Sequence, residues 1–545
     1  VETLPMTTRV DFAQYTEVTE FLTTATVPVG TYTQAKLTLD YASAEIWVEN
    51  AAGDGVQVPA ANIVDDTGAA LGTIEVTVQF DSTNRLVIAP GIPAQVTLDF
   101  DLASSNQVEF SGATPTVTVQ PVLVAGINRE SLKVHRLRGP LRSVDAASQT
   151  FRVIIRPFLH ALSGAQEEFG TLPVMTDVST VFEIDGQPYV GDAGLNELAS
   201  LPTLTAVIVM GEWNVTTRRY EADQVYAGSS VPGGTLDVVS GNVTARSGNQ
   251  LTVKGATLIR ASGSVIFRNE VTIDIGTNTT VTRQHSTSLG AIGDISVGQR
   301  VVVFGDLDGT DTVLDADFPG ALAHQLITTL RATVTQVSPL EVELVHIDGR
   351  PVSIFDFTGT GIDAPNDADP DAYHVDPGTL SLAGAIVGTP IKIRGFVTPF
   401  GHAASAADFE ARTVIDLTDV PGLFTVDWFP SSTTAVSGVA ASGLDLDLTG
   451  VGLFHHINRL GHIVDLATLS SAPSIIPDAT ASGHGVFAIT RIAGPIQVFF
   501  EFDDFAAALD QHLDSGRRVR SVVGIGRFED STATLTGTWL NVRLN

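Results

Sequence analysis

Short runs of alternating apolar and polar residues fill most of the chain. Residues 35–48, 74–80 and 116–124 place Val, Ile, Leu or Phe at nearly every second position, which is the period of a half-buried strand. The 50 Gly and 26 Pro residues separate these runs, as turn residues do between short antiparallel strands. Residues 503–515, which end before Gly516, instead have the spacing and length of a helix. The pattern predicts a mainly β protein.

One strand-turn-strand sequence recurs along the chain, each time with an alanine further on. The copies are 206–211 with Ala222, 297–305 with Ala316, and 387–395 with Ala411. Repetition over this distance indicates tandem domains. Each copy ends its strand in a glycine, at Gly211, Gly305 and Gly395. We expect these glycines where a strand bends sharply to close a small barrel, with the alanine facing the same crowded corner.

A chain of 545 residues is too long for one core, and the strand pattern divides it into five units. They are a β-sandwich at 1–128, barrel repeats at 135–228, 234–318 and 326–417, and a diverged C-terminal β domain with one helix (503–515) at 421–545. Three strands, a crossover and a hairpin are the chain order of the oligonucleotide- and oligosaccharide-binding (OB) barrel. We therefore predict a sandwich followed by three or four five-stranded OB-like barrels, arranged like beads on a string.

Short motifs carry a resemblance to two bacterial families. The turn Pro28-Val-Gly-Thr-Tyr-Thr33, the strand that follows it at 36–40 and the strand at 98–102 resemble a cell-envelope family catalogued as domain of unknown function 4382, and the repeats resemble family 5666. The resemblance implies a secreted β-sandwich followed by small barrels of unassigned activity. The chain has no cysteine that could be lipidated, so membrane anchoring is not implied.

The charge balance changes which partners we expect. There are 30 Lys and Arg residues against 61 Asp and Glu residues, a net charge of −31, which repels polyanions. The compact basic run is confined to 517–520, so nucleic acid is not expected as a partner. No apolar run is long enough to predict a membrane-spanning helix.

The absence of cysteine excludes disulfides, thiolate catalysis and cysteine-ligated zinc. The sequence begins at Val1 without a charged and then apolar leader. Together these features favour a processed extracytoplasmic protein, secreted, on the cell surface or in the periplasm of a Gram-negative bacterium.

Two acidic loops are candidate calcium sites, because calcium prefers oxygen ligands in flexible turns. The first contains Asp306, Asp308 and Asp311, with Asp315 nearby, and the second contains Asp363, Asn366, Asp367, Asp369 and Asp371. Neither has the full spacing of a calcium-binding loop. Asp and Gly are also common in hairpin turns, which favours a connection for the first loop and a solvated insertion for the second, with calcium as the alternative for each. Calcium is the one cofactor considered, and no other is expected.

Other chemistry finds less support. His455, His456, His462 and His484 suggest a copper or zinc site, but adjacent histidines on a strand point to opposite faces, and ordinary strand histidines explain them as well. No nucleophile elbow, zinc-protease motif or phosphate-binding loop occurs. We assign no catalytic residue and expect no enzyme.

The leading functional hypothesis is therefore a structural or assembly protein, a surface, filament or matrix component that self-associates through exposed strand edges. The alternative is a module that binds an oligosaccharide or a divalent cation on one barrel. A glycan site would need clustered aromatic rings, whereas Trp47, Trp213, Trp428 and Trp539 are spread one per region. A hydrolase is the third hypothesis.

Overall fold

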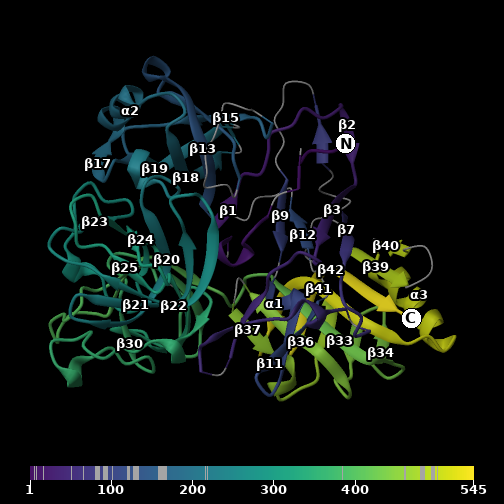
Figure 1. Cartoon of the computed structure of the whole chain (residues 1–545). Coiled ribbons are helices and arrows are strands. Elements are labelled where there is room, and N and C mark those ends of the chain that lie inside the picture. The colour runs from purple at the N-terminus through teal and green to yellow at the C-terminus, as the bar shows by residue number, and fades with distance from the viewer. Residues whose placement is uncertain are drawn as a thin grey trace.

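The computed structural model describes residues 1–545 except 5, 8, 16–17, 51, 66, 80–85, 90–95, 101, 120–122, 127–133, 158–167, 215, 218, 383, 460–461, 479–484, 492–496 and 500. Strands hold 53% of the chain, which confirms the mainly β class that the alternation predicts. Figure 1 shows teal and green barrels on one side, with the purple N-terminal strands and the yellow-green C-terminal domain on the other.

The first barrel is a closed ring of five strands. Around the ring, β13 pairs with β14, β14 with β15, β15 with β19, β19 with β18, and β18 with β13. Only the β15–β19 pair is parallel. The bounds are β13 (Val134–Asp145), β14 (Thr150–Ile154), β15 (Thr171–Met175), β18 (Ala206–Asn214) and β19 (Arg219–Ala227). This is the small five-stranded barrel that the chain order predicts.

A hairpin and a helix connect the third and fourth strands of this barrel. They are β16 (Val181–Ile184), β17 (Gln187–Val190) and α2 (Gly191–Ser200). Leu195 and Leu198 are the fifth and eighth residues of this ten-residue helix, and both are buried, because residues three apart lie on the same face of a helix. The hairpin extends the sheet beside β19, towards the second barrel.

The second and third barrels repeat the same ring, in which the third strand again pairs in parallel with the fifth. The second contains β20 (Asp237–Ser247), β21 (Gln250–Ile259), β22 (Val265–Asp274), β24 (Arg300–Leu307) and β25 (Val313–Asp315), with β23 (Thr280–Arg283) and β26 (Leu322–Leu326) added to its sheet. The third contains β27 (Thr328–Gln336), β28 (Leu340–Ile347), β30 (Tyr373–Asp376), β31 (Pro390–Val397) and β32 (Phe409–Asp416), with β29 (Arg350–Pro351) added. Each barrel has its own apolar core.

The repeated glycines occupy one kind of position in all three barrels and in the C-terminal domain. A Cβ added to Gly211, Gly305, Gly395 or Gly526 would lie 2.0 to 2.2 Å from a backbone oxygen of the paired strand, closer than any side chain tolerates. The predicted alanine faces this corner in the first and third barrels, where the Cα atoms of Ala222 and Ala411 would lie 2.9 and 3.0 Å from the added Cβ. In the second barrel the three nearest atoms belong to Asp315 and Leu314 rather than to Ala316. A residue without a side chain is therefore required where each strand bends.

The C-terminal domain keeps this corner but not the closed ring. Its strands are β33 (Gly422–Ser432), β34 (Val436–Ala440), β35 (Gly443–Leu446), β36 (Val451–Arg459), β37 (His462–Asp465), β38 (Ser474–Pro477), β39 (Val486–Arg491), β40 (Gln497–Phe499), β41 (Val519–Glu529) and β42 (Thr534–Leu544). Among its described residues, β36 pairs with β33 and β37 and does not reach β38. The predicted helix is present as α3 (Phe502–Asp514), which buries Phe502, Phe505 and Leu509.

The N-terminal strands pair in small ladders. These are β2 (Gly30–Tyr32) with β8 (Leu86–Ile88), β3 (Gln34–Asp40) with β7 (Thr73–Gln79), β4 (Trp47–Glu49) with β5 (Gly55–Gln57), β9 (Thr97–Phe100) with β12 (Leu123–Gly126), and β10 (Asn106–Ser111) with β11 (Thr114–Val119) and β6 (Ile63–Val64). The short helix α1 spans Leu102–Ser105. The ladders do not merge into two sheets within the described residues, so the sandwich stays a prediction. In addition, β1 (Val18–Glu20) leaves this unit and pairs with β13.

The hairpin β4–β5 joins the N-terminal unit to two barrels. The Trp47 ring stacks on Phe267 of β22 with ring centroids 4.6 Å apart, and the Gly55 amide donates to the Asn269 side-chain oxygen at 2.5 Å. Glu49 forms an ion pair with Arg350 at 3.0 Å. Because β22 belongs to the second barrel and Arg350 to the third, the hairpin contacts both at once.

A buried histidine–glutamate contact joins the first and second barrels. The imidazole Nε2 of His324 on β26 lies 2.8 Å from a carboxylate oxygen of Glu183 on β16, and each side chain is 5% exposed. The His324 ring lies between Tyr226 and Phe304. Burial alone would raise the pKa of Glu183, but the His324 contact holds it below its usual value. Removing one partner would leave the other polar and buried.

The repeated stretch at 297–305 also forms the junction between the second and third barrels. Val297 is fully buried and packs in the core of the third barrel, and the Val397 amide donates to the Gln299 side-chain oxygen at 3.2 Å. Nearby, the Asn242 side chain donates to Asp348 at 2.7 Å. The units are therefore not the separate beads that the sequence predicts. Polar and aromatic side chains of one unit contact side chains of the next.

Candidate binding groove on the third barrel

The third barrel carries an open groove of about 690 Å³. One wall is the connection between its first two strands, with Val337 and Pro339, and the other is the connection between its last two strands, which starts at Thr398. Leu382, from the loop before β31, completes the apolar lining. Strand-connecting loops of this kind form the ligand sites of OB barrels.

Charged groups lie along the β32 side of the groove. Arg283 reaches over from β23 of the second barrel, and its guanidinium lies 2.6 Å from Glu410 and 3.9 Å from the centroid of the Phe396 ring. Glu410 also pairs with Arg412 at 3.0 Å, so its charge is already matched. Asp376, the neighbour of Glu410 in the parallel β30–β32 pair, is exposed and forms no ion pair among the described residues.

The loop at 398–408 is fixed by buried polar contacts. His402 Nε2 lies 3.2 Å from an Asp408 carboxylate oxygen, and the two side chains are 7% and 9% exposed. The other Asp408 oxygen accepts the His374 amide at 2.9 Å, and Thr398 donates its hydroxyl to the Ala407 carbonyl at 2.6 Å. Burial raises the pKa of Asp408. This groove wall is therefore preformed.

The acidic loop at 363–371 lies in the same barrel, between β29 and β30. Asp367 accepts the Gly361 amide at 3.0 Å, and Asp369 accepts the Asp371 amide at 3.0 Å. Asn366 donates to Asp363. These are local turn contacts of Asp and Asn. The loop is also tied to the barrel, because the Leu344 amide of β28 donates to the Pro370 carbonyl at 2.8 Å and the Ala368 amide donates to the Thr360 hydroxyl at 2.8 Å.

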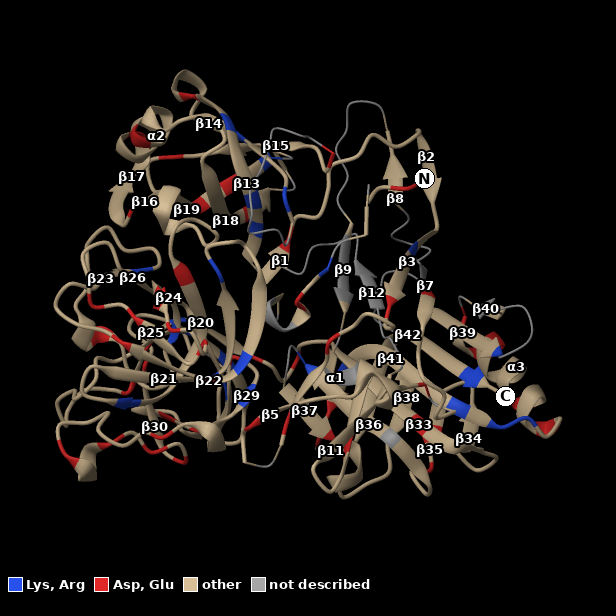
Figure 2. Ribbon diagram, in the orientation of Figure 1, with Lys and Arg blue, Asp and Glu red and all other residues tan. Residues whose placement is uncertain are grey.

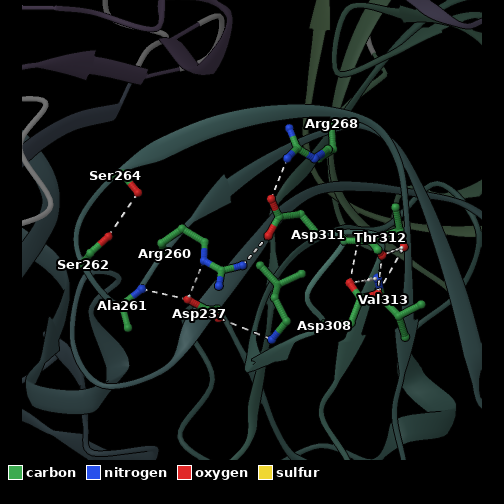
Figure 3. Close-up of polar contacts among 12 residues, drawn as sticks. Asp237, Arg260, Ala261, Ser262, Ser264, Arg268, Asp308, Asp311, Thr312 and Val313 are labelled. Atoms are coloured by element: carbon green, nitrogen blue, oxygen red, sulfur yellow. Dashed lines mark hydrogen bonds and ion pairs between the residues drawn. The ribbon is translucent and has the colours of Figure 1, made fainter.

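The acidic loop at 306–311 is the hairpin connection between β24 and β25. Figure 3 shows that Asp311 points to two guanidiniums, those of Arg260 and Arg268. Asp308 accepts the Thr310 hydroxyl and the Thr312 and Val313 amides, contacts that lower its pKa to about 2. Asp306 and Asp315 face each other in the ladder. The arginines supply the positive charge that a cation would bring.

Across the described part of the chain, no group of three or more His, Asp or Glu side chains is placed to hold a metal ion. Of the four clustered histidines, His484 lies outside the described residues. His455 contacts the Gly452 carbonyl and lies 3.4 Å from Asp465. Calcium binding stays a prediction for both loops. The loop at 363–371 is the better candidate of the two, because no arginine or lysine of the described chain pairs with its carboxylates.

Sequence reasoning missed the groove. The signal was the length of the connection between the last two strands: the eleven residues 398–408 separate β31 from β32 in the third barrel, against the five residues 308–312 between β24 and β25 in the second. The second and third barrels both contribute to the groove. Arg283 belongs to the second barrel, so the sequence does not assign it to the groove unless the two barrels are known to contact each other.

Comparison with known families, curated proteins and solved structures found no match for this chain. The resemblance to the two envelope families therefore stays a prediction. Within the described residues, no helix is long and apolar enough to cross a membrane.

Proposed function

We propose that this chain is a non-enzymatic binding protein whose docked β domains hold a peptide-binding groove on the third barrel. The observation that carries the proposal is the preformed wall at 398–408, which faces the 337–339 connection across a groove of about 690 Å³. Binding sites for small ligands and short chain segments commonly occupy roughly 300–1,000 Å³ and are largely preformed.

The lining favours a peptide over a sugar. Sugar rings stack on exposed aromatic faces, and among the described lining residues the one aromatic is Phe409, which is fully buried. The walls are instead aliphatic and proline side chains with hydroxyls at Ser338, Thr398 and Ser405. One Asp376 oxygen accepts the Gly378 amide at 2.8 Å, and the carboxylate forms no ion pair among the described residues, so it can pair with a lysine or arginine of the ligand. An extended peptide with apolar side chains and one basic residue matches this surface.

The test is binding of the full chain to an array of short peptides, with a glycan array in parallel. Ser338→Trp and Ser405→Trp change two exposed rim positions and place an indole in the groove, so affinity for a selected peptide is expected to fall by roughly tenfold or more. Ser470→Trp, exposed in the C-terminal domain, is the matched control. Binding to glycans alone, or peptide binding that both rim variants leave unchanged, would contradict the proposal.

A further inference from the structure

One edge of the first barrel is covered by a strand from outside its ring. The corner glycines mark equivalent positions on the first strands of the barrels, because they pair as Gly211 with His135, Gly305 with Asp237 and Gly395 with Thr328. The residues that follow these partners are Arg136, Val238 and Thr329, so these three positions are equivalent.

The second and third barrels cover this position with their own second strands. Val238 pairs with Ile259, the last residue of β21. The Thr329 carbonyl accepts the amide of Asp348, the residue directly after β28, at 2.7 Å. The two second strands hold ten and eight residues, which is long enough to follow the first strand to this point.

The second strand of the first barrel is shorter and leaves this edge open. It is β14, which holds five residues and ends at Ile154. The described chain after it contacts the first strand at Arg138, whose carbonyl accepts the Arg156 amide at 2.9 Å, two positions short of Arg136. An open strand edge is a site at which another strand can pair.

The N-terminal strand β1 occupies that edge. Its three residues pair in parallel with 134–136 of β13, and the Phe21 amide donates to the Arg136 carbonyl at 2.9 Å. Figure 2 shows β1 between the first barrel and the other N-terminal strands. β1 therefore stands where the second strand stands in the other two barrels.

The side chains next to this ladder are buried in the first barrel. A Glu20 carboxylate oxygen accepts Arg136 Nε at 2.6 Å, and the two side chains are 2% and 14% exposed. The Phe21 ring packs on the core and lies 5.0 Å from the Tyr220 ring, centroid to centroid. Further on, the Thr24 amide donates to the Phe169 carbonyl at 2.9 Å. Removing β1 would leave the Arg136 guanidinium without its carboxylate, which is costly for a buried charge.

A short exposed connection links this part of the chain to the rest of the N-terminal unit. Residues 25–29 form no helix or strand, and four of the five are exposed. Residues before β1 contact the unit through the Phe12 and Phe100 rings, 5.0 Å apart, and through the Arg9–Glu45 ion pair at 2.6 Å. All these contacts lie on one side of residues 25–29, so each can also form with a second copy.

We propose that the chain up to Thr24 is exchanged between copies, so that β1 of one copy completes the first barrel of a second. Exchange of an identical segment forms the same contacts again and is a low-cost route to dimers. The segment of the same copy competes at the effective concentration that its connection sets. Monomers are therefore expected in dilute solution, and exchanged dimers at high concentration.

The test uses disulfides, because the chain has no cysteine of its own. Val18 and Val134 are neighbours in the β1–β13 ladder, and strands about 4.8 Å apart lie within the reach of a disulfide. Full-length Val18→Cys and Val134→Cys chains are mixed at high concentration in about 150 mM NaCl, which screens the repulsion between copies of charge −31. After oxidation, a non-reducing gel is expected to show a two-chain band that reduction removes.

The control mixes Val18→Cys with Ser470→Cys, an exposed position of the C-terminal domain, and is expected to lack this band. The double variant Val18→Cys/Val134→Cys, oxidised while dilute, is expected to close its own disulfide. Sedimentation velocity should then show that it stays monomeric at concentrations at which the original chain forms dimers.

Melting curves report whether the variants fold, and the next pair of the ladder, Thr19→Cys with His135→Cys, replaces the first pair if they do not. A mixture that links no more than its control would show that β1 stays with its own copy, and would overturn the proposal. So would a locked double variant that associates as the original chain does, or one that forms no internal disulfide, because β1 would then not lie on β13.

Discussion

Single residues decide how tightly each barrel closes. The corner glycines show this most directly, because the paired strand's backbone passes within van der Waals contact of the Cα atom. Gly305 packs against the Asp315 carbonyl, and an added Cβ would lie 2.2 Å from that oxygen and 3.0 Å from the Leu314 side chain. Backbone atoms on a paired strand cannot move aside as the end of a flexible side chain can.

Gly305→Val is therefore expected to destabilise the protein by roughly 2–4 kcal/mol, the range of overpacking combined with backbone displacement. Chemical unfolding in urea, with the loss of the second barrel followed by circular dichroism, measures the change. Gly309→Ala, only four residues away, has nothing within 4 Å of the added Cβ and is the matched control. An unchanged unfolding midpoint for Gly305→Val would show that the corner is looser than the geometry indicates.

Another residue-scale effect concerns the pH dependence of stability. Burial, and then the Arg459 guanidinium, lower the pKa of His462 to about 4, and Arg331, His346 and Asp530 also act on it. In the unfolded chain the histidine has a pKa of about 6.5. Between these two values the unfolded state binds a proton that the folded state excludes, so stability falls as the pH drops from about 6.5 to about 4.

His462→Gln is expected to remove this part of the pH dependence, on the order of 3 kcal/mol across the window. The measurement is the free energy of unfolding of both proteins from pH 4 to pH 8. His285, whose pKa is also lowered but which does not act on His462, contributes equally to both curves and cancels in the difference. Parallel curves for the variant and the original chain would contradict the assignment to His462.

At the scale of elements, docking depends on a few residues of one short hairpin. The strands β4 and β5 hold only three residues each, too few to be stable alone. Their stability comes from the Trp47–Phe267 stack, the Gly55–Asn269 hydrogen bond and the Glu49–Arg350 ion pair. An aromatic pair contributes about 0.5–1.5 kcal/mol beyond its buried area.

Trp47→Ala is therefore expected to free the hairpin without unfolding the barrels. Hydrogen exchange followed by mass spectrometry should show faster exchange of the amides in 47–57 and unchanged exchange in the ladders of the second barrel. Val265→Ala, a partly exposed position at the start of the same strand as Phe267, is the matched control. Exchange that accelerates equally in the barrel and in the hairpin would instead indicate global destabilisation.

The elements also show which features sequence patterns can predict. Alternation locates the strands, and the repeated glycines mark the corners, because both follow from local geometry. Ring closure depends on parallel pairs such as β15–β19, whose partners lie far apart in the chain and leave no local pattern. Arg283 and Val297 carry no mark that they contact the next barrel. The groove and the junctions therefore appear only when the barrels are placed together.

The whole molecule behaves as one body if the junctions hold together in solution. The Glu183–His324 pair, the Val297 contact and the β4–β5 hairpin lie at different places and join different units. A compact chain of 545 residues has an expected radius of gyration of roughly 24 Å. Five domains of about 13 Å touching in a row would instead give a value on the order of 45 Å.

Small-angle X-ray scattering, extrapolated to zero protein concentration, is expected to give a radius within several ångströms of the compact value. The double variant Trp47→Ala/Arg350→Ala removes the ring stack and the ion pair and leaves the hairpin only the Gly55–Asn269 hydrogen bond. It is expected to raise the radius, because the N-terminal unit is then held less tightly against the second and third barrels. Barrels joined through Glu183 and His324 should stay together in this variant, so the increase should stop well short of the extended value. A radius near the extended value for the original chain would mean that the junctions are not maintained in solution. Arg283 of the second barrel would then no longer line the groove of the third barrel.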